Sequence, residues 1–583
     1  MAFHNPDCFG CGLTEITPSD RLRRMKQLSG LLSGILFIHL PLPTFALPIP
    51  EEVAEELLHI SKKDLNELFD VRNHKGERVF RKKNDPEPGI WATRDPNKDQ
   101  LEGTSTDLLY RKFRIPKSGA PVIVAVIDSG VDISHPELRE KLWTNETELY
   151  GKPGVDDDGD GYIDDVYGWN FIGNRDGRNL KESNLELARV YSGLKRKESE
   201  GVLSATEIKL LRKTSSELQS KIESATKAQI KFEAYAAAIE FLKRKGMKAE
   251  TLAALDALDF SDPEIKTALI LARDVFSRGL TSKAIADYLD YFRTSLKYHL
   301  NPAFDPSEVI GDDPGNMSEI GYGNPDVTGP DSLHGTHVAG IIAADRDNSF
   351  GIDGQARNVR IMSLRAVPDG DERDKDIANA IRFAVDHGAK IINMSFGKPY
   401  SPGKATVDQA VLYAESKGVI LIHAAGNDHL NTEGDFFNYP NRDLTTLNTR
   451  ASSWIEVGAS GKKRDQFLAA EFSNFGKTSV DVFAPGVEIV STAPGNRYAT
   501  LDGTSMASPE VAGIAAILLS KVPKASAAQI RDAILSTVNH YPDLRCVLPG
   551  TARNIPTMVP FDSLSVSGGT VNALEALRWL LAN

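Results

Sequence analysis

Three residues that lie far apart in the chain have the types and surroundings that nucleophilic catalysis requires. Asp128 ends an apolar run, and His334 and Ser505 each precede a run of small and apolar residues. A serine hydroxyl becomes a nucleophile when a histidine accepts its proton and a carboxylate orients that histidine. The order Asp, His, Ser is one of the known orders of such a triad.

Each of these residues also has a structural interpretation. An isolated aspartate or histidine at such a place more often has a structural role, and a serine before an apolar helix is usually an N-cap. Around Ser505, Gly503 allows a substrate backbone to come close, and Pro509 is tolerated in a first helical turn, whose amides lack partners. Because all three residues occur together and in this order, we expect a catalytic triad.

Five short segments resemble the subtilisin-like serine proteases, the subtilase family. They are Val126–Val131, His334–Gly340, Asn393–Gly397, Ala424–Asn427 and Gly503–Pro509. Five matching segments in one order argue against a chance match, although any one of them would be weak. Glu510 departs from many relatives, which carry histidine there, but this position is outside the triad.

The resemblance implies an endopeptidase in which Asp128 orients His334 and His334 takes the proton of Ser505. It further implies that Asn427 and the Ser505 amide donate to the oxyanion, and that an extended substrate pairs with the edge strand 359–367. The substrate-binding residues expected on this basis are Ser395, Phe396, Gly397, Ala366 and Asp369.

A charged segment follows this edge strand. Asp369, Asp371 and Glu372 would lie beside the substrate residues upstream of the cleaved bond, where partly desolvated carboxylates favour lysine or arginine. Arg365 or Arg373 could already neutralise these carboxylates, so a solvated loop without selectivity is the alternative.

Alternating strand and helix patterns predict the elements that position these residues. Buried strands are predicted at 122–127, 359–367, 390–394, 418–426, 454–457 and 480–483, and helices at 376–387, 407–417 and 571–581. Strands that alternate with helices imply a parallel sheet covered by helices on both faces. We therefore expect an α/β fold, subtilisin-like by resemblance, with polar site residues at the carboxyl ends of the strands.

Residues 179–305 separate the aspartate from the histidine and have a different composition, rich in the strong helix formers Ala, Leu, Glu, Lys and Arg. Residues 204–207 and 261–264 each have the pattern of a capping box. We expect a long α-helical insertion, in the form of a hairpin, that divides the catalytic domain into residues 119–178 and 306–583. It is either a passive elaboration or a gate for substrate access.

The acidic segment 155–165 has the spacing of a cation-binding loop, with carboxylates at alternate positions and a glycine at the sixth. The candidate calcium ligands are Asp156, Asp158, Asp160, the carbonyl of Tyr162, and Asp164 or Asp165. Tyr167 stands where an EF-hand has its glutamate. The alternative is a solvated acidic turn, in which so many like charges would repel one another.

The N-terminal part predicts export. A basic start at Met25 precedes an apolar run at 28–40 and a small residue, Ala46, which indicates a secretory signal cleaved after Ala46. This run is short for a membrane span. We therefore expect residues 1–46 to be a leader plus signal peptide, with translation starting at Met25, and residues 47–118 to be a possible propeptide. The protein would then be secreted or periplasmic.

Composition limits the possible partners. The chain has 583 residues, 41% of them hydrophobic, and a net charge of -12, which is ordinary for a globular protein and argues against a nucleic-acid-binding surface. The expected partners are polypeptide substrates, with no nucleic acid and no stable membrane span after signal removal. The alternative function is that of a catalytically silent relative that binds a partner through the helical insertion.

Overall fold

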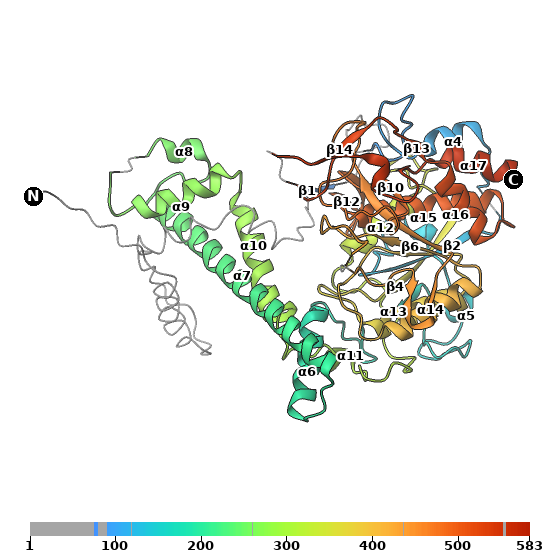
Figure 1. The fold of residues 1–583 in the computed structure, drawn as a ribbon, viewed down its shortest axis with the longest axis horizontal. Coiled ribbons are helices and arrows are strands. Elements are labelled where there is room, and N and C mark those ends of the chain that lie inside the picture. Colours follow the sequence, from blue (N-terminus) through green and yellow to red (C-terminus); the bar gives the residue numbers. More distant parts are fainter. Residues whose placement is uncertain (1–74, 80–89, 118, 259–260, 435–436, 552–554) are drawn as a thin grey trace, which may run out of the picture.

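A computed structural model describes residues 75–79, 90–117, 119–258, 261–434, 437–551 and 555–583. The expected signal peptide and most of the possible propeptide lie outside these residues. Figure 1 shows a body built around a sheet, from which a group of helices projects. We call this group the helical arm and define it as residues 186–299.

The body contains a nine-stranded sheet with the order β13-β16-β10-β9-β6-β5-β2-β4-β3. Its strands are β2 (Val122–Asp128), β3 (Gly168–Asn170), β4 (Val359–Arg365), β5 (Ile391–Met394), β6 (Ile420–Ala424), β9 (Trp454–Ser460), β10 (Val482–Pro485), β13 (Asn539–His540) and β16 (Gly569–Thr570). Neighbouring strands are parallel except for the antiparallel β13–β16 pair. The predicted α/β fold class is confirmed.

Strand β2 lies between β4 and β5, so the strand order reverses beside it. Its apolar, largely β-branched sequence is buried at six of seven positions, as expected of a parallel strand that helices cover on both sides. In register, Asp128 lies opposite Arg365. The carboxyl end of such a strand is where open α/β sheets form a ligand crevice.

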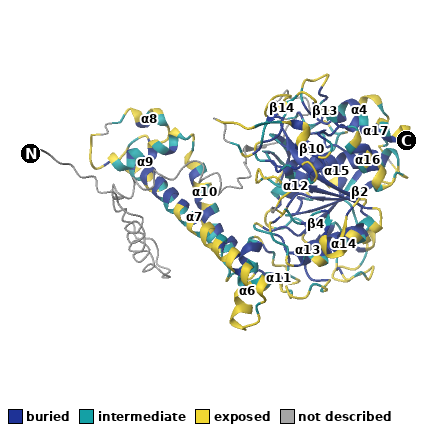
Figure 2. Cartoon of the chain, viewed as in Figure 1, coloured by how far each residue is buried: buried dark blue, intermediate teal, exposed yellow. Residues whose placement is uncertain are grey.

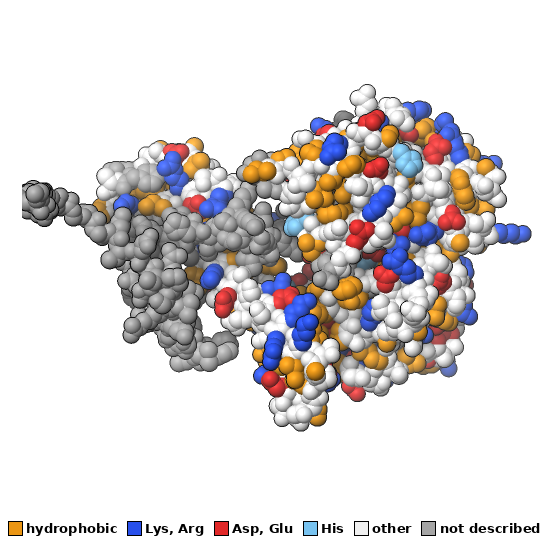
Figure 3. Space-filling view, in the orientation of Figure 1, with side chains coloured by type: hydrophobic (Ala, Val, Ile, Leu, Met, Phe, Trp, Pro, Cys, Tyr) orange, Lys and Arg blue, Asp and Glu red, His pale blue; other side chains and the backbone are white. Residues whose placement is uncertain are grey.

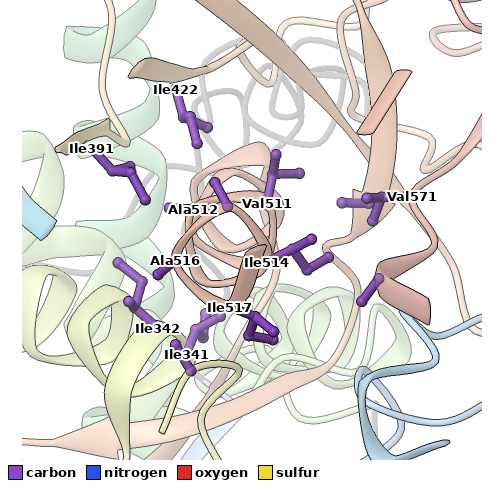
Figure 4. Packing of buried hydrophobic residues seen from close by; sticks show 14 of the residues in the cluster. Ile341, Ile342, Ile391, Ile422, Val511, Ala512, Ile514, Ala516, Ile517 and Val571 are labelled. Atoms are coloured by element: carbon purple, nitrogen blue, oxygen red, sulfur yellow. The ribbon is translucent and has the colours of Figure 1, made fainter. Parts of the chain in front are cut away.

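Helices cover both faces of this sheet, and each face has its own hydrophobic core. On one face pack α12 (Leu333–Ala343) and α15 (Thr504–Lys521), and on the other pack α13 (Asp374–Asp386) and α14 (Lys404–Ser416). Figure 4 shows α15 with Ile514 and Ala516 among side chains from β5, β6 and α12. Fifteen of the eighteen residues of α15 are buried, which explains why its sequence is apolar all round.

The chain approaches α15 through a hairpin of β11 (Ile489–Ala493) and β12 (Arg497–Leu501), to which β1 (Lys75–Val79) adds as a third, antiparallel strand. After α15 come α16 (Ala527–Ser536) and α17 (Ala573–Ala582). Helix α17 confirms the predicted C-terminal helix, and its buried face joins the core around α15.

The helical arm confirms the predicted insertion but is more than a hairpin. Its elements are α6 (Glu186–Ser199), α7 (Ala205–Arg244), α8 (Leu252–Asp256), α9 (Lys266–Ser277), α10 (Ser282–Thr294) and a π-helical turn, η2 (Ser295–His299). Helices α6, α9 and α10 all pack on α7 and share a separate core. Exposed and buried residues alternate along α7 in Figure 2.

The two predicted capping boxes have different outcomes. Ser204 and Glu207 form both reciprocal hydrogen bonds at the start of α7, so the first box is confirmed. The second is wrong, because α9 begins at Lys266 and its N-cap, Ile265, makes no side-chain cap.

Among the described residues, no helix is both long and apolar enough to cross a membrane, and Cys546 is a buried free thiol. On the face of the body that Figure 3 shows, positive and negative side chains are interspersed. A positive face of the kind that binds nucleic acid is not visible in that view.

Candidate active site

The ends of β2, α12 and α15 meet at a cleft of about 480 Å³. His334 and Ser505 line this cleft, and Asp128, which is only 1% exposed, lies beneath His334. The Nδ1 atom of His334 donates to Oδ1 of Asp128 over 2.7 Å. The structure thus brings together all three residues that the sequence analysis singled out.

Close packing makes this contact possible. Gly335 lies in the first turn of α12, where a Cβ atom would come within 2.1 Å of the carbonyl oxygen of Gly130. Without a side chain at this position, α12 can sit directly on the loop that follows β2. Gly335 therefore holds His334 against Asp128.

Ser505 is not an N-cap, so that structural alternative is wrong. Helix α15 begins at Thr504 with Gly503 as its N-cap, which makes Ser505 the second helical residue. Its hydroxyl donates to the carbonyl oxygen of Ser395 over 3.0 Å and not to His334. Catalytic hydrogen bonds often align only when substrate is bound, so this geometry is compatible with a nucleophile at rest.

The side chain of Ser395 is tied to the same helix. Its hydroxyl donates to the carbonyl oxygen of Ser505 over 2.9 Å and lies 2.8 Å from the hydroxyl of Ser508. It also accepts from the side-chain amide of Asn393 on β5 over 2.9 Å. The wall of the cleft and the first turn of α15 therefore form one hydrogen-bonded unit.

Asn427 follows β6 and lines the cleft. Its Oδ1 atom accepts from the backbone amide of Thr504 over 2.9 Å and from the hydroxyl of Thr504 over 3.0 Å. That hydroxyl in turn accepts from the amide of Gly426 over 3.1 Å. With Oδ1 engaged in this way, the Nδ2 group is left to donate elsewhere.

Four of the five expected substrate-binding residues line the cleft, namely Ser395, Phe396, Gly397 and Asp369. Ala366 is fully buried and lies outside the lining. Its backbone amide donates to the carbonyl oxygen of Asp128 over 3.0 Å, so this amide connects the end of β4 to the end of β2.

The acidic segment after β4 is only partly exposed to a substrate. Asp369 is exposed, but Asp371 accepts from the amide of Glu186 over 2.8 Å and Glu372 is only 2% exposed. Burial raises the pKa of Glu372 to about 8, although Lys398 acts in the opposite direction. All three residues line the cleft, as the sequence analysis expected, but only Asp369 is an exposed residue.

The cations that neutralise this segment are also different from those proposed. Arg365 donates to the carbonyl oxygen of Ser129 over 3.0 Å, and Arg373 pairs with Asp312 over 3.0 Å. The segment is instead contacted by two other cations. Arg189 on α6 donates to the carbonyl oxygens of residues 371 and 372, and Lys398 donates to that of residue 372 and to Glu186.

The helical arm supplies part of the cleft, which the sequence analysis did not predict by residue. The lining residues from the arm are Asp287, Tyr288 and Tyr291 of α10 and His299 of η2. The Nε2 atom of His299 lies 3.4 Å from Oδ1 of Asp369. The arm therefore contacts the edge of the cleft directly.

Two groups of side chains at the acidic loop have ligand atoms that lie within 4.8 Å of one another. One group is Asp158, Asp160 and His387, and the other is Glu148, Asp158 and Asp165. Asp165 is fully buried, and its Oδ2 atom has no hydrogen-bond partner. Burial raises the pKa of Asp165 to about 7, although His387, whose Nε2 atom lies 3.5 Å from this Oδ2 atom, acts in the opposite direction.

The other expected ligands have different surroundings. The carboxylate of Asp156 accepts from the amides of Gly159 and Gly161 over 2.6 and 2.9 Å, which folds the loop back on itself. Asp164 accepts from the amide of Gly154 over 2.8 Å. The ring of Tyr162 packs in the core.

Glu148 and His387 lie at the acidic loop but were missed: Glu148 lies outside the run of alternating carboxylates, and His387 is distant in sequence. Glu148 accepts from the amides of residues 157, 158 and 164. The Nδ1 atom of His387 lies 2.9 Å from the carbonyl oxygen of Phe383, and its Nε2 atom lies 2.9 Å from Oδ2 of Asp160. An ion would therefore be surrounded by candidate ligands from three segments: α5, the acidic loop and residue 387.

Comparison with known proteins adds a second line of observation. Residues 119–556 match the sequence model of the subtilase family, Peptidase_S8. A thermophilic serine proteinase from Bacillus sp. (strain AK1) is 46% identical over 208 residues, which is 35% of this chain and 47% of that protein. Subtilisin DY from Bacillus licheniformis is 39% identical over 211 residues, which is 36% of this chain and 72% of that protein.

The match therefore spans about half the length of the thermophilic proteinase. A solved structure of a protease from Pseudoalteromonas arctica superposes with a TM-score of 0.45 at 18% identity, over 86% of this chain and 99% of that chain. That likeness is too low to support an argument.

Proposed function

The chain belongs to the subtilase family, and we propose that it is a serine endopeptidase in which Ser505 attacks the peptide carbonyl. The observation that supports this most is the 2.7 Å hydrogen bond from His334 to the buried Asp128, in the same cleft that Ser505 lines. A histidine oriented in this way by a carboxylate is the general base of a triad.

In this proposal the Nδ1 proton of His334 stays on the side of Asp128, so Nε2 carries the lone pair that accepts the hydroxyl proton of Ser505. The alkoxide oxygen attacks the carbonyl carbon, and the imidazolium then protonates the leaving amine. Water hydrolyses the acyl-enzyme by the same steps. Asp128 keeps its charge throughout and stabilises the imidazolium.

We further propose that the Nδ2 group of Asn427 and the backbone amide of Ser505 donate to the oxyanion. Thr504 supports this role, because it holds Oδ1 of Asn427 through two hydrogen bonds and so fixes the amide before the reaction begins. Loss of one such donor costs on the order of 100-fold to 1,000-fold in kcat, a magnitude measured on a relative in this family.

The substrate would be an extended polypeptide that lies between the end of β4, at residues 366–369, and the wall formed by residues 395–397. Strand β4 is not the free edge that the sequence analysis predicted, because β3 pairs with it at residues 363–365 and both backbone groups of Asp369 bond residues 181 and 183. The substrate would therefore pair beyond the end of β4, and pockets on either side of it would receive its side chains. Ser395, Phe396 and Gly397 would contact the residue upstream of the cleaved bond.

Peptide hydrolysis tests this proposal. Wild type should cleave fluorogenic peptides, and Ser505→Ala and His334→Ala should lose at least roughly 1,000-fold in kcat, because members of a triad act as a unit. Ser520→Ala, a serine on the same helix and far from the cleft, should retain activity. A folded wild type that cleaves nothing would instead favour a catalytically silent binding protein.

We also propose that the acidic loop holds a calcium ion through Asp158, Asp160, Asp165 and Glu148. The buried Asp165, whose Oδ2 atom has no hydrogen-bond partner, fits a hard cation, which carboxylate oxygens bind best. A bound ion would cross-link the loop to α5 (Glu146–Leu149). The alternative is that protonated His387 alone neutralises these carboxylates.

Finally, we propose that the protein is exported, either to the periplasm or to the outside of the cell, and that a propeptide is removed from the part of residues 47–118 that precedes Trp91, because Trp91, Leu108 and Leu109 are buried in the core of the body. The support is the predicted signal before Ala46. N-terminal sequencing of the protein from its native host tests this, because an intact start at Met1 or Met25 would contradict it.

A further inference from the structure

Helix α10 of the arm presents an acidic side chain and two aromatic rings to the active-site cleft. Asp287, Tyr288 and Tyr291 all line it, and the two tyrosines are three residues apart, which places them on one face of the helix. This wall comes from the inserted segment.

The tyrosine rings are held by their neighbours. The ring of Tyr288 lies 4.9 Å from that of Phe232 on α7, and the ring of Tyr291 lies 6.4 Å from that of His299. His299 in turn lies 3.4 Å from Asp369, which follows β4. Rings that are already fixed lose little conformational entropy when a ligand binds.

The cleft is acidic. Apart from Asp371 and Glu372, which Arg189 and Lys398 contact, its lining carboxylates are Asp287, Asp331, Asp369, Asp428 and Asp502. The cations of the lining are Lys181 and Arg365. Lys181 pairs with Glu182 over 2.8 Å, and Arg365 is buried and donates to Ser129 and Asn170. Lys181 also attracts Asp369 and Asp331, and Arg365 attracts Asp331. These five carboxylates still outnumber the two cations, so the lining attracts a cationic side chain.

We propose that Asp287, Tyr288 and Tyr291, together with Asp369, form a subsite that binds an arginine side chain of the polypeptide substrate. A guanidinium stacks on aromatic faces and pairs with carboxylates, and does so better than an ammonium group. Asp369 lies beyond the end of β4, beside the proposed path of the substrate, so the arginine lies upstream of the cleaved bond. This subsite rests on the proposed endopeptidase function and assigns a binding role to the helical arm.

The test uses pairs of fluorogenic peptides that differ only by arginine or glutamine at one upstream position, with each of the four upstream positions tested in turn. For wild type we expect kcat/KM to favour the arginine peptide on the order of tenfold at one position, mainly through KM. In Asp287→Asn and in Tyr288→Leu/Tyr291→Leu this ratio should fall toward one.

Two variants are controls. Asp290→Asn removes an exposed charge from the same helix outside the cleft lining and should keep the ratio. Tyr288→Phe retains the aromatic ring and should keep most of the preference for the arginine peptide. Equal values for the two peptides in wild type at every position would overturn the proposal. So would a loss of preference in Asp290→Asn as large as that in Asp287→Asn.

Peptide binding to the Ser505→Ala protein separates this subsite from the proposed catalysis. Calorimetry should show tighter binding of the arginine peptide than of the glutamine peptide, and the difference should shrink with added salt. If wild type cleaves no peptide but the inactive variant binds arginine selectively, the subsite stands and the enzyme assignment fails. Equal binding of both peptides would contradict the subsite whether or not wild type is active.

Discussion

Ser395 and Ser505 exchange two hydrogen bonds: the hydroxyl of Ser505 donates to the carbonyl oxygen of Ser395, and the hydroxyl of Ser395 donates to the carbonyl oxygen of Ser505. The pair joins the cleft wall to the first turn of α15. Before Ser505 can react, its hydroxyl must turn from Ser395 toward His334. The side chain of Ser395 would meanwhile hold the helix in place.

Ser395→Ala should therefore lower kcat/KM by roughly tenfold, because a lost hydrogen bond of about 1 kcal/mol loosens the start of α15. Asn393, which donates to Ser395 over 2.9 Å, would also lose a partner, so stability should fall by about 1 to 2 kcal/mol. Peptide hydrolysis and urea unfolding measure the two effects. Ser416→Ala, on the surface of α14, is the control, and a matching loss there would refute the positioning role.

A network of ion pairs connects the helical arm to the body. Arg189 and Lys398 both contact Glu186, over 2.6 and 2.7 Å. Burial alone would raise the pKa of Glu186, but these two cations lower it to about 2. Replacing residues 180–300 by a linker would remove Glu186 and Arg189 and leave Lys398 and Glu372 without these partners. We therefore expect that replacement to impair folding as well as substrate access.

Arg189→Met tests this attachment with a single residue. It should lower the free energy of unfolding by about 3 to 5 kcal/mol, because it leaves buried carboxylates without a compensating charge. Arg196→Met removes an exposed arginine from the same helix and should change stability by less than about 0.5 kcal/mol. Chemical unfolding measures both, and similar losses in the two variants would show that the buried network contributes little.

Much of this site could be expected from sequence because its residues lie at the ends of regular elements. The apolar run before Asp128 and the helices after His334 and Ser505 have strong patterns, and parallel strands bring their carboxyl ends to one edge. Gly335 fits this pattern, because α12 can pack closely on the loop after β2 only if residue 335 has no side chain.

The contacts of the arm could not be expected in the same way. Arg189 and Tyr288 have the ordinary types of a helix surface, and only the tertiary fold shows that one is buried against the segment after β4 and the other lines the cleft. Glu148 was missed because it lies outside the run of alternating carboxylates that predicted the loop. Charge patterns predicted Arg365 and Arg373 as partners, but side-chain pairing depends on the direction in which each residue points.

Glu510 should make stability depend on pH. It is buried on α15, where its carboxylate accepts from Gln355, and burial raises its pKa from 4.5 to about 8. Between these values the folded state keeps a proton that the unfolded state releases, so stability falls as pH rises, by at most about 1.4 kcal/mol per unit.

Glu510→Gln removes this titration and should be more stable than wild type at pH 8, with a flatter profile between pH 5 and 8. Glu140→Gln, at an exposed carboxylate, should keep the wild-type slope. Unfolding curves at several pH values provide the measurement. Parallel profiles for wild type and Glu510→Gln would show that Glu510 does not cause the dependence.

Calcium removal should destabilise the acidic loop. If the ion binds the folded state, a chelator should lower the melting temperature, and 100 times Kd of added calcium should restore about 2.7 kcal/mol. Asp158→Asn should weaken this response, because Asp158 belongs to both sets of candidate metal ligands. Asp157→Asn changes the loop charge equally but lies outside both groups, so it should respond as wild type does. An unchanged melting temperature on chelation, with no metal found by elemental analysis, would instead support neutralisation by His387.

The central claim is that Ser505 is a nucleophile activated by His334, and covalent labelling tests it most directly. A fluorophosphonate probe reacts with an activated serine hydroxyl and leaves a stable adduct whose position mass spectrometry can locate. We predict one adduct, on Ser505, that disappears in His334→Ala although the serine is still present. An unlabelled wild type that remains folded, or an adduct that persists in His334→Ala, would contradict the account.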